Sequence, residues 1–342
     1  MVLESIAVPA TNRFASLYID QQDPVKDFFH YPITDEVFAL RHTDLMERDF
    51  NREGLAQCIR NYMKRFPVSD KTNFSLEKLA SPKSAVVIGG QQAGLLTGPL
   101  YTIHKIISII KLAEEQEREM GVPVVPVFWI AGEDHDFLEI NHVYTENQKK
   151  LRKISYPELP YEKVMASDFR YDKEKMHKWI DLVVEHLGER EHTKETMHFL
   201  HAAAEKGETV TDMFSYIIMA LFKEYGLLVI DSADRQLRKL EVPLFQELID
   251  KAEILTETVL NQQELIVKHG FGRAIELDQH ASNLFYYDGN ERLLLEWDPA
   301  HNRFMTKNGE HSFSKAELQD ILTHHPERFS NNVVTRPLMQ EW

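Results

Sequence analysis

One segment constrains the fold of this chain more than any other: two short apolar runs, separated by a glycine-rich loop and an amphipathic helix. The first run, residues 85–88, contains β-branched residues, and we expect Gly89 and Gly90 to end it. Pro99 suits the first position of a helix. The second run, residues 124–130, is typical of a buried strand. This order predicts a βαβ unit of a parallel sheet, with its loop at the carboxyl end of the first strand.

The middle of the chain continues this alternation. Residues 170–225 are predicted to be helical, and residues 227–230 form a third apolar run that leads into Asp231. A helical region follows to about Lys268, and we expect Pro243 to kink or split it. Together with the βαβ unit, these segments predict an α/β fold.

The C-terminal part of the chain changes pattern. From Asn283 onward short strands are predicted, with hairpin turns at the Asp-Gly of 288–289 and the Asn-Gly of 308–309. The two valines at 333–334 are predicted to begin another buried strand, yet the sequence stops at Trp342. Three parallel strands are too few for a well-covered doubly wound sheet, so we expect a truncated chain.

Composition limits the classes of function. The 342 residues include 39 basic and 54 acidic side chains, which give a net charge of −15 and argue against non-specific nucleic-acid binding. The single cysteine, Cys58, rules out an intramolecular disulfide and a thiolate metal cage, and it favours a reducing compartment. We find no targeting signal and no apolar run long enough to cross a membrane. We therefore expect a cytoplasmic protein without a nucleic-acid or membrane partner.

The glycine-rich loop is the first candidate site. It includes Gly90, Gln91, Gln92, Thr97 and Gly98, between the first strand and the helix. Backbone N–H groups in such a turn, together with the helix dipole, favour an anion such as phosphate. The loop matches neither the dinucleotide GxGxxG pattern nor the GK[ST] of a P-loop. The alternative interpretation is a turn that only reverses the chain.

The segment after the second strand is the second candidate. Six titratable residues crowd into positions 133–142: Glu133, Asp134, His135, Asp136, Glu139 and His142. If this segment opens a helix, Glu139 and His142 share a face. Such a set could hold a divalent metal or supply a general base, although the HExxH zinc pattern is absent. Acidic residues in a first helical turn would equally complement the helix dipole.

The end of the third strand is the third candidate. A carboxylate at Asp231 can hydrogen-bond a ribose hydroxyl or a substrate ammonium. Asp234 could equally cap a helix, with Arg235 and Arg238 on its solvated face.

Three motifs in this order resemble one family: VVIGGQQAGLLTGPLYTIHK, PVFWIAGEDHDFLEINHV and LLVIDSADRQLRKLE. The tail, FSKAEL followed by FSNNVVTRPLMQEW, resembles the same family, the bacillithiol biosynthesis cysteine-adding enzymes, also called cysteine ligases. The resemblance implies a cytoplasmic protein with a Rossmann-like parallel sheet core, related to class I nucleotidyl transferases, with helical and small β-hairpin insertions. We divide the chain into a first part of the core (1–150), a helical insertion (151–225), a core strand with long helices (226–282), a β-hairpin insertion (283–329) and the start of a further core strand (330–342).

The resemblance also implies an activity. It is the last step of bacillithiol synthesis, which joins cysteine to the amine of glucosaminyl malate through an amide bond. Family members continue beyond the point that matches Trp342 and form homodimers through a coiled coil. The superfamily places a His-x-Gly-His signature after a Thr-Gly. Here Thr97-Gly98 leads to the run 101–104, which keeps only the second histidine, His104.

The chemistry suggests roles for the candidate residues. A carboxylate condenses with an amine at neutral pH only when its oxygen becomes a leaving group, so the leading hypothesis is ATP-linked ligation with ATP or ADP as the cofactor. Gly98 and His104 would contact phosphate or a developing oxyanion. Asp134 and His135 would orient substrate or move a proton, and Asp231 would bind a ribose hydroxyl or an ammonium.

Two alternatives stay open. The acidic segment could support metal-assisted hydrolysis, although no residue is assigned as a metal ligand. A truncated chain could also be inactive and act only as a binding module.

Overall fold

The computed structural model describes residues 10–34, 36–147 and 150–342. It divides into two units, one of residues 1–49 with 254–279 and one of residues 50–253 with 280–342. No helix in the described ranges is both long enough and apolar enough to span a bilayer.

The smaller unit is helical. Phe14 packs on Phe28 with ring centroids 6.2 Å apart and meets Phe271 edge-on at 5.2 Å. Its elements are α1 (Arg13–Ile19), η1 (Val25–Phe28), α2 (Val37–Met46) and most of α12 (Ala252–Lys268).

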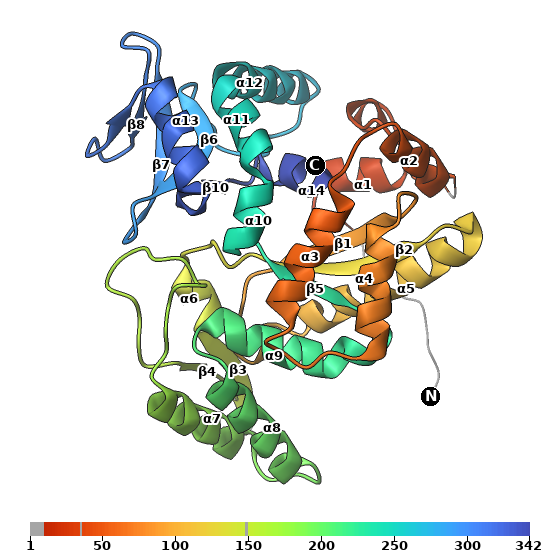
Figure 1. The fold of residues 1–342 in the computed structure, drawn as a ribbon, viewed down its shortest axis with the longest axis vertical. Coiled ribbons are helices and arrows are strands. Elements are labelled where there is room, and N and C mark those ends of the chain that lie inside the picture. Colours follow the sequence, from red (N-terminus) through yellow and green to blue (C-terminus); the bar gives the residue numbers. More distant parts are fainter. Residues whose placement is uncertain (1–9, 35, 148–149) are drawn as a thin grey trace. The chain divides into compact units, whose positions relative to one another are not determined.

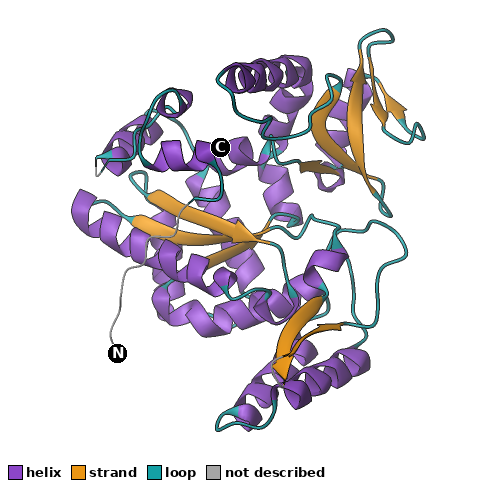
Figure 2. Cartoon of the chain, turned by 180° about the vertical axis from the view of Figure 1, so that it is seen from behind, coloured by secondary structure: helices purple, strands orange, loops and turns teal. Residues whose placement is uncertain are grey.

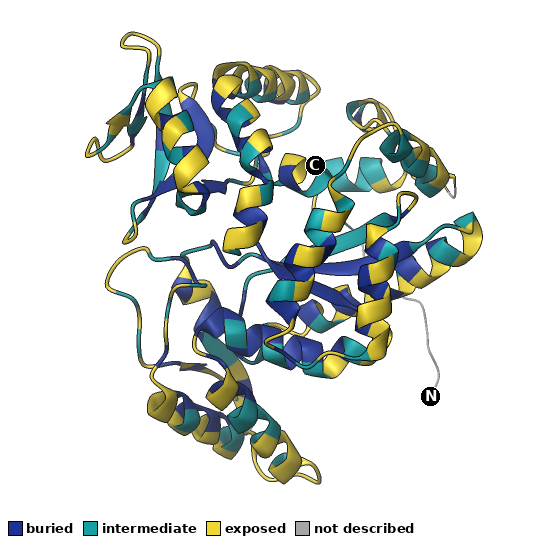
Figure 3. Ribbon diagram, in the orientation of Figure 1, coloured by how far each residue is buried: buried dark blue, intermediate teal, exposed yellow. Residues whose placement is uncertain are grey.

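The larger unit contains the predicted parallel sheet. Its strands are β1 (Ala85–Gln91), β2 (Val124–Ile130) and β5 (Leu228–Asp231), in the order β1-β2-β5 (Figure 1). Every residue of the central strand β2 is buried, whereas β1 at the sheet edge is half-buried (Figure 3). The prediction of a buried strand is therefore confirmed for the second apolar run, whereas the first run is only half-buried. The Rossmann-like α/β fold class is confirmed.

The first strand runs through both glycines that the sequence predicted would end it. A Cβ on Gly89 would lie 2.6 Å from Ile109 Cδ1, and a Cβ on Gly90 would lie 2.6 Å from the Trp129 carbonyl oxygen. The glycines are therefore needed for close packing rather than for a turn. As a consequence, Gly90 and Gln91 belong to the strand.

Helices cover the sheet. In Figure 1, α3 (Arg52–Met63) and α4 (Asp70–Ala80) lie in front of the strands and α5 (Tyr101–Met120) lies behind them. The Asn51 side chain caps α3 by accepting a hydrogen bond from Gly54 N at 3.0 Å. The helix α5 begins two residues after Pro99, and it ends at Gly121 in the left-handed conformation.

The segment after β2 differs from the predicted helix. The helix α6 (Phe137–Ile140) is a single turn, and His142 begins β3 (His142–Asn147), which pairs antiparallel with β4 (Lys150–Ser155). The condition under which Glu139 and His142 would share a helix face is therefore not met. The predicted helical region follows as α7 (Lys173–Leu187), α8 (Thr193–Lys206), α9 (Val210–Phe222) and η3 (Lys223–Tyr225) (Figure 2).

The helices after β5 are divided as predicted, because Pro243 stands in the first turn of α11 (Val242–Asp250), directly after α10 (Arg235–Leu240). An antiparallel sheet of order β10-β6-β7-β8-β9 follows, and both predicted hairpin turns are present. Its elements are β6 (Ala281–Tyr287), β7 (Arg292–Asp298), β8 (Arg303–Thr306), β9 (Ser312–Phe313), α13 (Lys315–His324), η4 (Pro326–Arg328) and β10 (Phe329–Asn331).

The structure of the last residues differs from one prediction. Residues 333–334 lie in a turn before α14 (Arg336–Glu341), and β10 pairs antiparallel with β6 instead of joining the parallel sheet. The Asn332 side chain accepts hydrogen bonds from Val334 N and Thr335 N at 2.8 and 3.1 Å. This local bonding replaces strand pairing, so the core strand predicted over 330–342 is absent from these residues. The other segment boundaries stay predictions.

Candidate functional site

The three parallel strands end in one row. Gln91 is in register with Ile130, and Ile130 is in register with Asp231. The Ala131 N–H donates to the Gln91 carbonyl at 3.0 Å, and the Ser232 N–H donates to the Ile130 carbonyl at 2.8 Å. The loops that follow the strands therefore start side by side at the carboxyl edge, where open α/β sheets bind ligands.

The loop before α5 has an unusual backbone. Leu96, Thr97 and Gly98 are three successive residues with positive φ, at 53°, 79° and 67°. Residues other than glycine rarely adopt this conformation, and such strain clusters at functional sites. The Thr102 hydroxyl in the first turn of α5 is buried and has no hydrogen-bond partner in the described ranges. Together, Thr97, Gly98 and Thr102 offer polar groups that fit an anion such as phosphate.

A chain of side-chain hydrogen bonds joins the end of β1 to the loop after β2. Lys105 Nζ donates to Gln91 Oε1 at 2.9 Å, and Gln91 Nε2 donates to Gln92 Oε1 at 2.8 Å. Gln92 Nε2 then donates to Glu139 Oε2 at 3.0 Å and lies 3.4 Å from Asp134 Oδ2. We call these five residues the edge network. The two glutamines and Asp134 were predicted as site residues and Glu139 as a member of the acidic set, whereas Lys105 received no role.

His104 lies outside the edge network. It is exposed on α5, and its imidazole forms no hydrogen bond or ion pair with another described residue. The structure therefore leaves it at the surface near the helix start.

Asp134 and His135 occupy the turn after β2. Asp134 Oδ1 accepts hydrogen bonds from the backbone N–H groups of His135 at 2.8 Å and Asp136 at 3.3 Å. His135 is half-buried, and its Nδ1 is a buried atom without a partner in the described ranges. Burial lowers the pKa of His135, and the charge of Arg292 lowers it further, so the imidazole is neutral at pH 7. A neutral imidazole can accept a proton.

A buried ion cluster lies behind this turn. The Arg238 side chain forms ion pairs with Glu133 and, at 2.8 Å, with Glu241. All three side chains are at most 4% exposed, and burial raises the pKa of Glu241 to about 7. Arg238 therefore does not lie on a solvated face as one interpretation predicted, and its apolar neighbours in α10 were the only sequence signal of its burial.

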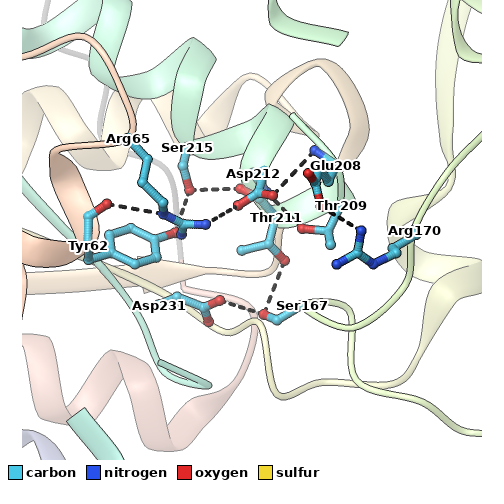
Figure 4. A network of polar contacts seen from close by, with 10 residues as sticks. All are labelled: Tyr62, Arg65, Ser167, Arg170, Glu208, Thr209, Thr211, Asp212, Ser215 and Asp231. Atoms are coloured by element: carbon cyan, nitrogen blue, oxygen red, sulfur yellow. Dashed lines mark hydrogen bonds and ion pairs between the residues drawn. The ribbon is translucent and has the colours of Figure 1, made fainter. Parts of the chain in front are cut away.

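The Asp231 carboxylate is enclosed by protein. Ser167 Oγ donates to Asp231 Oδ2 at 2.5 Å, and the Ala233 N–H donates to Oδ1 at 2.9 Å (Figure 4). A Cβ on Gly132 would overlap both Ser167 Oγ and Asp231 Oδ1. Burial raises the pKa of Asp231 to about 7. Ser167 comes from a loop that the sequence analysis did not assign to any site.

Asp234 caps α10, which confirms the second interpretation of this residue. Its Oδ1 accepts from the backbone N–H groups of Gln236 and Leu237 at 2.9 and 3.0 Å. Cys58 Sγ lies 3.5 Å from the same oxygen, and burial raises the pKa of that thiol. The thiol is therefore protonated and not a nucleophile.

The side chains of the acidic segment, residues 133–142, do not surround a common centre. Glu133 faces Arg238, Glu139 faces Gln92, and His142 lies in β3. Within residues 10–34, 36–147 and 150–342, no three His, Cys, Asp or Glu side chains are arranged to hold a metal ion. The observation that motivated metal-assisted hydrolysis is therefore not supported by the geometry.

Comparison with known proteins identifies relatives along the whole chain. The family model described as "Bacillithiol biosynthesis BshC, N-terminal Rossmann-like domain" matches residues 1–342. Proteins named "Putative cysteine ligase BshC" from Geobacillus sp. (strain WCH70) and Geobacillus kaustophilus are each 45% identical to this chain, and the one from Bacillus licheniformis is 41% identical. Each match covers 100% of this chain and 63% of the relative.

The chain thus spans somewhat less than two thirds of the length of these curated relatives. The matched part contains the three strand ends, the strained loop and the edge network. The chain belongs to the family of BshC N-terminal Rossmann-like domains.

Proposed function

We propose that this protein is a cysteine ligase of bacillithiol biosynthesis, which forms an amide bond between the carboxyl group of cysteine and the amine of glucosaminyl malate. The observation that carries the proposal is the convergence of the strained loop, the edge network and His135 at one edge of the sheet. The names of the relatives support the ligase class. We further propose a cytoplasmic location and, for the longer protein, a homodimer.

The loop before α5 is suited to hold the nucleotide. ATP would supply the phosphoryl or adenylyl group that turns a carboxylate oxygen into a leaving group, and ADP shares its phosphate chemistry. Thr97, Gly98 and the Thr102 hydroxyl would bind phosphate oxygens, since the hydroxyl has no other partner in the described ranges. His104, exposed at the start of α5, would contact the phosphate or the developing oxyanion.

The turn after β2 is suited to the amine. An ammonium must lose a proton before its nitrogen can attack, and a neutral imidazole at His135 can accept that proton. The Asp134 carboxylate, whose Oδ2 lies 3.4 Å from Gln92 Nε2, would orient the ammonium. The Asp231 carboxylate would not contact substrate, because both its oxygens already accept hydrogen bonds from protein groups. It would therefore fix the Gly132 turn rather than contact ribose directly.

Profiling of small thiols tests the proposal. We expect deletion of the gene in its source organism to abolish bacillithiol and to accumulate glucosaminyl malate, as measured by mass spectrometry. Complementation with the intact gene should restore the thiol, whereas the His104→Ala and His135→Gln genes should restore it slowly or not at all. The exposed-histidine variant His192→Gln, on the α7–α8 loop, is the matched control. An unchanged thiol profile in the deletion strain, with bacillithiol present in the parent, would contradict the assignment.

A further inference from the structure

Two histidines of the helical hairpin α7–α8 face each other through their ring nitrogens. The two helices pack side by side in the larger unit (Figure 1). His177 on α7 and His201 on α8 approach each other with a distance of 2.6 Å between their Nδ1 atoms. The two side chains are 30% and 29% exposed, so the pair is partly sheltered and solvent still reaches it.

Each histidine has a carboxylate at its other ring nitrogen. His201 Nε2 lies 2.9 Å from Asp181 Oδ1, and His177 Nε2 lies 3.5 Å from Glu205 Oε2. Hydrogen bonds from Lys173 and His177 lower the pKa of Glu205, which keeps its carboxylate ionised. Because an ionised carboxylate only accepts hydrogen bonds, these contacts place the N–H of each ring at Nε2.

This tautomer leaves the two Nδ1 atoms as acceptors that point at each other. A neutral imidazole has one N–H, so a ring that carries it at Nε2 presents a lone pair at Nδ1. Two lone pairs only 2.6 Å apart repel unless a proton or a metal ion lies between them. Histidine is ordinarily neutral above pH 7, and two neutral rings supply no proton for this gap.

We propose that His177 and His201 bind one divalent transition-metal ion, of the zinc, copper or nickel class, through their Nδ1 atoms. Imidazole nitrogen suits these metals, whereas Mg²⁺ and Ca²⁺ select oxygen ligands. A histidine that ligates a metal almost always donates its other N–H to a carboxylate or carbonyl, which fixes the tautomer. Both rings of the pair have a carboxylate in that position.

The metal would link the two helices. With Zn–N distances of about 2.1 Å and tetrahedral angles, two ligating nitrogens lie about 3.4 Å apart, so the rings would separate by about 0.8 Å. Partly exposed side chains accommodate such a shift by small rotations. No third His, Cys, Asp or Glu among the described residues completes the set, so water would occupy the remaining positions. The site uses none of the residues assigned to the ligase, and the inference is independent of that function.

Calorimetric titration of the purified chain with ZnCl₂ at pH 7.5 tests the site. We expect the strongest site of the wild type to bind one Zn²⁺, and His177→Gln or His201→Gln to weaken this binding about tenfold or more. His186→Gln is the matched control on α7, because its Nδ1 lies 2.7 Å from the Leu182 carbonyl oxygen and outside the pair. Mg²⁺ should not compete with Zn²⁺. Circular dichroism of each variant checks that it is folded.

A second variant keeps both histidines. Asp181→Asn replaces the exposed carboxylate beside His201 with a neutral amide of nearly the same shape. It should weaken Zn²⁺ binding about tenfold, because loss of such a partner costs about 10–100-fold in metal affinity. Zn²⁺ should also raise the melting temperature of the wild type more than that of His177→Gln, since only the folded chain brings the two rings together.

Three results would overturn the proposal: no Zn²⁺ binding by the wild type, equal affinities of the wild type and both histidine variants, or an equal rise in melting temperature for the wild type and His177→Gln. The contact between the rings would then be a shared proton. Unchanged binding by Asp181→Asn would overturn the assignment of Nδ1 as the ligating atom.

Discussion

The carboxyl edge of the parallel sheet carries two kinds of polar structure that differ in their access to solvent. The edge network of Gln91, Gln92 and Lys105 with its two acids is partly open to solvent, and in each of its hydrogen bonds at least one partner is a glutamine amide. The ion cluster around Arg238 lies directly behind it and is almost completely buried. Exposed hydrogen bonds exchange easily with water, whereas a buried charge is fixed by its partners. The comparison indicates that the buried cluster sets the position of the turn after β2, whereas the side chains of the edge network are partly open to solvent.

The largest expected effect is in the buried cluster. Arg238→Met leaves Glu133 and Glu241 buried without their cation, and removal of one partner of a buried ion pair costs about 3–5 kcal/mol of unfolding free energy. Urea unfolding measures this loss. Arg235→Met, an exposed residue of the same helix, is the control and should change stability by less than about 0.5 kcal/mol. Similar stabilities for the two variants would show that the cluster is not the anchor of this edge.

A second prediction concerns pH. Burial raises the pKa of Asp231 from 3.8 to about 7, so between these values the folded chain holds a proton that the unfolded chain has lost. Asp231 therefore contributes most to stability below pH 4, and that contribution falls as the pH rises to 7. Asp231→Asn removes the titration of this carboxyl group. The unfolding free energy of the variant, relative to that of the wild type, should therefore rise by on the order of 4 kcal/mol between pH 4 and pH 8. Unfolding free energies of both proteins across this range measure the gain, and a constant difference would contradict the prediction.

A third prediction concerns the packing of β1. Gly90→Ala brings a Cβ to within 2.6 Å of the Trp129 carbonyl oxygen, so the strands must shift, at a cost of about 1–3 kcal/mol. Thermal unfolding of this variant measures the loss. Gly272→Ala has no atom within 4 Å of the new Cβ and serves as the control. Equal melting temperatures would mean that the close approach of β1 and β2 tolerates a methyl group.

The smallest effect on stability is expected in the edge network. Gln92→Ala removes three side-chain hydrogen bonds at the sheet edge, each worth about 1 kcal/mol or less, yet under the proposed function it disconnects Asp134 from Gln91. We therefore expect a nearly unchanged free energy of unfolding for this variant. A deletion strain that carries the Gln92→Ala gene should contain clearly less bacillithiol than one that carries the wild-type gene. Gln57→Ala, which also removes an exposed amide hydrogen bond, is the control. Full restoration of bacillithiol by the Gln92→Ala gene would show that the edge network is not needed for the activity.

Much of the local structure was predictable because it depends on neighbours in the sequence. The hairpin glycines and the break at Pro243 act over a few residues, and they were predicted correctly. The errors occurred where distant residues intervene. A helix opening within residues 133–142 was one interpretation, under which Glu139 and His142 would share a face, but His142 pairs across a hairpin with Ser155.

The candidate site likewise has a part that was predictable from the sequence and a part that was not. Its place at the carboxyl ends of the strands followed from the order of apolar runs, which brought Gln91, Gln92 and Asp134 into consideration. The burial of Asp231 by Ser167 could not be predicted, because the two residues are far apart in sequence and meet only after the sheet has formed. The same holds for Arg292, whose place in an amphipathic hairpin gave no sign that its charge would be enclosed.

By itself, the sequence determined the α/β class, the positions of the parallel strands and the family, because apolar periodicity, turn residues and long motifs are properties of contiguous segments. Only the tertiary structure decided which charges are neutralised, which are buried and which face the sheet edge. Solvation and pairing of a charge depend on every group around it in space, and that surrounding is assembled from segments that the sequence keeps apart.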